Sequence, residues 1–121
     1  MNAMLWVLQG LLAAVFAFSG VAKSMLSKER LIAGGQTGVT PFPLPLIRFT
    51  AVCELLGALG MILPGLLRVA VVLTPLAAAG FAVIMVAAIA SHAWLREPVN
   101  VAGTSALLLV AVAVSAGRFA G

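Results

Sequence analysis

Four long apolar stretches follow one another along the chain, separated by shorter polar connections. A helix needs about 20 mostly apolar residues to cross the hydrocarbon layer of a bilayer. On that criterion the expected spans are residues 4–22, 46–66, 69–91 and 99–117. The pattern predicts an all-α fold, an antiparallel bundle of four transmembrane helices. The whole chain, residues 1–121, then forms a single membrane domain with no separate soluble part.

The connections between the expected spans are unequal. Pro64 and Gly65 predict a tight turn before Arg68, because Pro cannot donate a backbone hydrogen bond to a continuing helix. On the opposite side lie the longer loop 23–45 and the segment from Ser91 to Pro98. In the longer loop, SKERLIAGG predicts a short interfacial helix. The following GGQTGVTPFPLP predicts an irregular segment folded back on the mouth of the bundle.

Small side chains on the second and third spans predict close helix packing, because apolar helices in lipid associate through van der Waals contact. Pro75 lies six residues into the expected third span. There it would free the carbonyl of Val71 and kink the helix. Two interpretations remain open, a functional hinge and a kink that a membrane helix tolerates.

The composition agrees with a membrane protein and excludes several function classes. Hydrophobic residues make up 64% of the chain and charged residues 8%, whereas soluble domains carry about 25% charged residues. One Cys, one His and three acidic residues are too few for an iron–sulfur cluster, a two-histidine haem or a closed zinc site. The seven basic residues flank the spans and form no continuous basic face, which argues against nucleic-acid binding.

Basic residues also indicate an orientation. On the long-loop side lie Lys23, Lys28, Arg30, Arg48 and Arg96. Only Arg68 and Arg118 lie on the side that holds both termini. Because retained loops tend to be basic, we expect a multi-pass protein of the plasma or bacterial inner membrane with long loops in the cytoplasm and termini outside. The net charge of +4 favours contact with anionic headgroups.

Glu54 is the most informative residue for function. A carboxylate inside the hydrocarbon costs at least about 2.5 kcal/mol and is seldom placed there without a role inside the bundle. Helical spacing puts Glu54 on one face with Ala51 and Gly57, so it is expected to point toward other helices. The candidate partners for it on other spans near the same mouth of the bundle are Lys23, His92, Asn100 and Thr104.

Two interpretations of Glu54 remain open at this point. In the first, it pairs with Lys23 and fixes the register of the helices. In the second, it lines a cavity that binds a polar headgroup or carries a proton. The candidate residues for such a site are Glu54, Lys23, Arg48, His92 and Asn100. Lys23, Arg48 and His92 are also typical interfacial residues, and the sequence predicts neither a catalytic residue set nor a metal site.

Two motifs carry a resemblance to a known family. The first span closes with FAFSGVAK, which contains Ser19, Gly20 and Lys23, and the second contains RFTAVCELLGALGMILP, with Glu54, Gly57 and Gly60. With these motifs the chain resembles the DoxX-like family of small four-helix membrane proteins, and the likeness covers most of its length. Members of that family resemble accessory subunits, redox-linked membrane partners or assembly factors. The resemblance implies no shared reaction.

Three hypotheses for function follow. The first is an accessory or assembly subunit of a larger, respiratory or redox-linked membrane complex, with no catalysis and no resident cofactor of its own. The second is a quinone- or lipid-binding protein that uses Glu54, Lys23 and Arg48 at the bundle mouth. The third is a small proton-coupled exporter that resembles the small multidrug resistance family. That family places its essential Glu in span one among aromatic residues, whereas here Glu54 lies in span two beside Gly, Ala and Thr. The expected partners are the lipid bilayer and a larger membrane complex or a second copy of the chain.

Overall fold

The computed structural model describes residues 2–120, which fold into helices joined by short connections. Four long helices are each long and apolar enough to cross a membrane. They confirm the predicted all-α, four-span bundle. In chain order the elements are α1 (Asn2–Met25), α2 (Lys28–Ala33), the 3-10 helix η1 (Thr37–Val39), α3 (Leu44–Leu67), α4 (Leu73–Trp94) and α5 (Pro98–Ala120).

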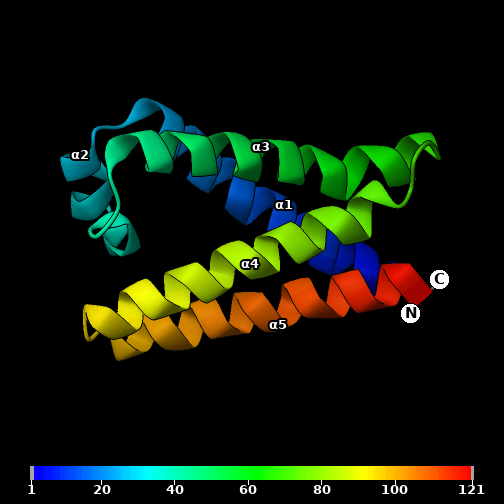
Figure 1. Ribbon diagram of the computed structural model, residues 1–121. Helices are drawn as coiled ribbons and strands as arrows, with labels where there is room; N and C mark the ends of the chain where they lie inside the picture. Colours follow the sequence, from blue (N-terminus) through cyan, green and yellow to red (C-terminus); the bar gives the residue numbers. More distant parts are fainter. Residues whose placement is uncertain (1, 121) are drawn as a thin grey trace.

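The four long helices pack as two pairs, α1 with α3 and α4 with α5, and α3 against α4 joins the pairs. Both ends of the described chain lie at one end of the bundle, and α2 lies at the other (Figure 1). Helices α3 and α4 approach each other near the turn that connects them and diverge toward the end that holds α2 and η1 (Figure 1).

The half of the bundle nearer the termini is filled by an apolar core. Phe16 and Phe81 stack with ring centroids 3.9 Å apart and ring planes 8° from parallel. Gly57 makes this possible, because a Cβ there would lie 2.5 Å from Phe81 Cε1. The buried residues of this core cluster are Leu12, Phe16, Met61, Ala78, Phe81, Met85, Ala111 and Val114.

The turn predicted at Pro64 and Gly65 is wrong, because α3 continues through both to Leu67. Pro64 removes the hydrogen bond that would reach the carbonyl of Gly60. The Thr74 hydroxyl donates to that carbonyl instead, at 2.7 Å, and side-chain hydroxyls are a known means of satisfying backbone freed by Pro in membrane helices. The chain reverses after Leu67, where Arg68 and Ala70 adopt left-handed backbone angles, with φ of 55° and 49°.

The third span was expected from residue 69, with Pro75 in its interior, and this placement is also wrong. Helix α4 begins at Leu73, so Pro75 falls in its first turn, where a missing N–H has no helix partner to lose. The carbonyl of Val71 accepts from the backbone N–H of Thr74 at 3.3 Å and is not left free. The predicted kink therefore has no cause.

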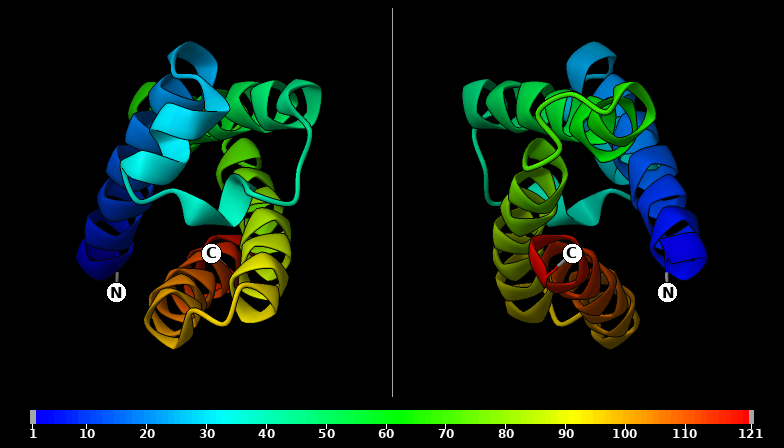
Figure 2. Two further views of the ribbon diagram at one scale, coloured as in Figure 1. Left: turned by 90° about the vertical axis from the view of Figure 1, so that its left-hand side faces the viewer. Right: turned by 90° about the vertical axis from the view of Figure 1, so that its right-hand side faces the viewer.

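The loop between α1 and α3 contains the predicted short helix, α2, and the predicted irregular segment. Ser27 caps α2, its hydroxyl accepting from the N–H of Arg30 at 3.2 Å. Residues 34–43, which we call the mouth segment, contain only the single turn of η1 and cross the open end of the bundle between α2 and α3 (Figure 2). Gly35 supports the turn into this segment with a φ of 105°, which favours glycine.

Candidate functional site

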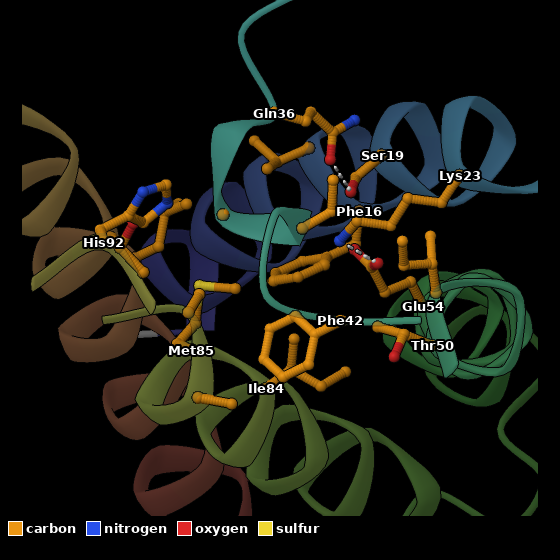
Figure 3. A pocket seen from close by; sticks show the side chains of 18 of the residues that line it. Phe16, Ser19, Lys23, Gln36, Phe42, Thr50, Glu54, Ile84, Met85 and His92 are labelled. Carbon is orange, nitrogen blue, oxygen red and sulfur yellow. Dashed lines mark hydrogen bonds and ion pairs between the residues drawn. The ribbon is translucent and has the colours of Figure 1, made fainter. Parts of the chain in front are cut away.

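A cavity of about 450 Å³ occupies the open end of the bundle, beneath the mouth segment (Figure 3). All four long helices and the mouth segment contribute to its wall. Most of the lining is apolar, with Phe16, Ile84 and Met85 among the side chains that close it toward the core. The polar lining residues are Ser19, Lys23, Gln36, Thr50, Glu54, His92, Asn100 and Thr104.

An ion pair between α1 and α3 lies in the cavity wall. Lys23 Nζ is 2.7 Å from Glu54 Oε1, and the two side chains are 14% and 1% exposed. Gly20 allows this approach, because a Cβ there would lie 2.7 Å from Leu55 Cγ and 3.1 Å from the carbonyl oxygen of Ala51. The predicted inward orientation of Glu54 and its contact with Lys23 are confirmed.

The second carboxylate oxygen of Glu54 is unusual. Oε2 is buried and has no hydrogen-bond partner among residues 2–120. A buried acceptor without a partner costs about 1–3 kcal/mol, and more when it is charged. Glu54 also lines the cavity, so a donor bound there that displaces the atoms covering Oε2 would satisfy this acceptor.

Arg48 is placed differently from the other candidates. It does not belong to the cavity lining. Its guanidinium Nη1 donates instead to the carbonyl of Lys23, which lies in the last turn of α1. Carbonyls in the last turn of a helix lack a partner within the helix. Arg48 therefore fixes the end of α1 against α3, next to the ion pair, and the structure gives it no contact with the cavity.

His92 and Asn100 line the cavity but belong to a second polar cluster at the turn between α4 and α5. His92 Nδ1 donates to Glu97 Oε1 at 2.8 Å, and the Thr37 hydroxyl donates to the same oxygen at 2.7 Å. Asn100 Nδ2 donates to the Thr37 hydroxyl at 3.4 Å. In Figure 3, His92 lies across the cavity from Lys23 and Glu54. Of the candidate partners of Glu54, His92 and Asn100 therefore do not pair with it, because Glu97 and Thr37 engage them.

Glu97 holds the mouth segment and was missed by the sequence analysis. The one available signal was a carboxylate five residues after His92, on the far side of a short turn. The Ser91 hydroxyl adds a bond of 2.6 Å to the carbonyl of Gly38. Together these contacts fasten the mouth segment to the ends of α4 and α5. Hydrogen bonds from His92 and then from Thr37 lower the pKa of the Glu97 carboxyl below its ordinary value.

Acid should therefore loosen the mouth segment. A carboxyl whose pKa is lowered by folding contributes stability above its ordinary pKa, and this contribution is lost as the pH falls through the lowered value. Hydrogen–deuterium exchange in residues 34–43, corrected for the intrinsic pH dependence of exchange, should accelerate over that acidic range. Glu97→Gln should remove this response, and an equal response in that variant would contradict the assignment to Glu97.

A second group of polar residues missed by the sequence analysis lies at the opposite end of the bundle. Gln9, which is buried, donates from Nε2 to the carbonyl of Met61 at 2.7 Å. Arg118 donates from Nε to Gln9 Oε1, and its guanidinium lies 5.5 Å from the ring centroid of Trp6. These contacts tie α1, α3 and α5 together, away from the cavity.

The sequence profile of the DoxX-like family matches residues 7–114, which include all of α3 and α4 and most of α1 and α5. No curated protein and no solved structure matches the chain. Among residues 2–120, no group of three or more His, Cys, Asp or Glu side chains is placed to hold a metal ion. The match over most of the sequence and the four apolar helices show that the chain belongs to the DoxX-like family of membrane proteins.

Proposed function

We propose that this protein binds a lipophilic molecule with a polar head, a quinone or a lipid, in the cavity at the open end of the bundle. The observation that carries the proposal is the unpartnered Oε2 of Glu54, a buried carboxylate in the wall of a cavity of about 450 Å³. A charged group with a free acceptor is costly in an apolar setting. A ligand that completes its hydrogen bonding offsets that cost.

The size and lining of the cavity support the same function. Sites for small molecules are commonly about 300–1,000 Å³, mostly apolar, with a few polar groups that fix the orientation of the ligand. Here Lys23 and Glu54 form one polar point, and Phe16, Ile84 and Met85 offer an apolar surface. A molecule with a polar head and an apolar body matches this division.

A purely structural role for the ion pair accounts for less of what is seen. The bond from Lys23 to Glu54 Oε1 is enough to fix the register of α1 against α3. Such a role needs neither a cavity beside the pair nor a second oxygen without a partner. Ligand binding accounts for both the cavity and the unpartnered oxygen. It is also compatible with a bond from Lys23 to Glu54 that fixes the register of α1 against α3.

Native mass spectrometry tests the proposal, using protein extracted gently from its own membrane. Wild type should carry an additional mass of a quinone or lipid, and Glu54→Gln should retain much less of it. Glu29→Gln makes the same chemical change on an exposed residue of α2 outside the cavity, so it should behave as wild type. The Glu54→Gln variant should still fold, since a Gln at position 54 can accept a hydrogen bond from Lys23. Circular dichroism of all three proteins checks that the bundle is intact.

Two results would contradict the proposal. One is a wild-type protein that carries no small molecule after gentle extraction in several detergents. The other is a bound mass that Glu54→Gln and wild type retain equally, because the ligand would then be held somewhere other than this wall.

A further inference from the structure

From the groups in the cavity wall, we infer which class of polar head the site selects. We propose that the head has no net charge and presents a hydrogen-bond donor next to an acceptor, the donor meeting Glu54 and the acceptor meeting Lys23. This inference rests on the proposed function and narrows its ligand.

The donor is required by Glu54. An ionised carboxylate only accepts hydrogen bonds. One of its oxygens is satisfied by Lys23, while Oε2 is buried and unpartnered among the described residues. Because Oε2 is buried, a head must displace the atoms that cover it. A head that then offers an N–H or O–H group forms a charge-assisted hydrogen bond, which is about twice as strong as a neutral one. A head that carries only acceptors would instead place lone pairs against a carboxylate.

The acceptor is favoured by Lys23. An ammonium group has three N–H donors. Within residues 2–120 the Lys23 side chain makes one hydrogen bond, the one to Glu54. Lys23 lines the cavity and its side chain is 14% exposed, and its remaining N–H groups have no hydrogen-bond partner among residues 2–120. A carbonyl, hydroxyl or phosphate oxygen next to the donor of the head matches them.

The charge of the site argues for a head that is neutral overall. The positive charge of Lys23 and the negative charge of Glu54 cancel. On the other wall His92 is paired with Glu97, so that pair brings no excess positive charge. The guanidinium of Arg48 is directed to a backbone carbonyl and lies outside the lining. An anionic head would enter without a net opposite charge, and burying such a charge is strongly unfavourable.

Two sources share this chemistry. A lipid with a primary ammonium and a phosphate, such as phosphatidylethanolamine, is zwitterionic and has N–H donors next to phosphate oxygens. A hydroquinone with an apolar tail is uncharged, and each of its hydroxyls both donates and accepts. The inference concerns the donor and the net charge that the two have in common, and the experiment separates them.

The test compares molecules that differ only in the feature proposed. Delipidated protein is equilibrated with micelles containing equal amounts of phosphatidylethanolamine, phosphatidylcholine and phosphatidylglycerol, and retention is measured by native mass spectrometry. In a parallel experiment the micelles contain decylhydroquinone and its dimethyl ether. The choline lipid and the ether lack the N–H or O–H donor, and the glycerol lipid is anionic. We expect the preferred donor-bearing molecule to be retained about tenfold better than its matched counterpart, as one charge-assisted hydrogen bond allows.

Each outcome decides a separate point. A preference for the ethanolamine lipid over both other lipids, or for the hydroquinone over its ether, supports the inference and identifies the source. In Glu54→Gln that preference should disappear. The inference is overturned if each molecule and its counterpart are retained equally, or if the anionic lipid is preferred. In either case the proposed function still holds as long as retention depends on Glu54. Retention that is the same in wild type and Glu54→Gln for every molecule overturns the proposed function itself.

Discussion

Replacing Lys23 with Met should lower the free energy of unfolding by on the order of 3 kcal/mol, since breaking a buried pair leaves an uncompensated charge. The Glu54 side chain is only 1% exposed, and within the described part of the chain its one hydrogen bond comes from Lys23. Met retains most of the length of the Lys stem, so the loss of the charge dominates over the loss of packing. Thermal unfolding in detergent, followed by circular dichroism, measures the effect.

The matched control is the double variant Lys23→Met with Glu54→Gln. No charge is left in the wall in that protein, so it should recover a large part of the lost stability. The difference between the double variant and the sum of the single variants gives the coupling of the pair. A double variant as unstable as Lys23→Met alone would mean that packing of the Lys stem, and not the ion pair, holds α1 on α3.

Replacing Gly57 with Ala should destabilise the bundle by about 1–3 kcal/mol, the usual cost of overpacking a core. The new Cβ would lie 2.5 Å from Phe81 Cε1 and 2.6 Å from Cζ. Phe81 is 1% exposed and stacked on Phe16, so its ring has little room to move away. Because Phe16 also lines the cavity, the same change should reduce retention of the ligand.

Gly10→Ala provides the matched control for this variant. It makes the same substitution inside α1, where a Cβ would meet nothing within 4 Å. There the gain in helix propensity of about 1 kcal/mol should leave the protein as stable as wild type or slightly more so. The same unfolding experiment measures both Ala variants. Equal stabilities would contradict the prediction, because the Phe81 ring would then move away from the new Cβ without lowering the free energy of unfolding.

Much of the fold could be predicted because the constraint of the bilayer is simple. Charge-free apolar runs located the four spans. A lone acidic residue within them pointed inward, with Lys23 as one of few cations within reach. The turn after α3 could not be placed, because Pro64 is tolerated only through a hydroxyl from Thr74, which lies beyond the turn. Such a contact exists only once the chain has reversed.

The cluster around Glu97 was unpredictable for a related reason. Thr37 lies in a segment with no hydrophobic periodicity, so nothing in the sequence indicated that it would meet the turn between α4 and α5. For Arg48 the position could be predicted but the hydrogen-bond partner could not. Its position near the ion pair was expected, but its bond to a backbone carbonyl depends on where α1 ends. The hypothesis of an accessory or assembly subunit remains a prediction that binding of a ligand in the cavity would not contradict.

The stacked rings of Phe16 and Phe81 divide the bundle into a hollow half and a filled half. On the proposed function, a molecule bound beside Lys23 and Glu54 would therefore exchange with one leaflet of the bilayer, the one that surrounds the α2 end. Passage to the other leaflet would require the two rings to separate and the core behind them to open. The exporter hypothesis thus acquires a definite structural requirement: a second conformation in which Phe81 leaves Phe16.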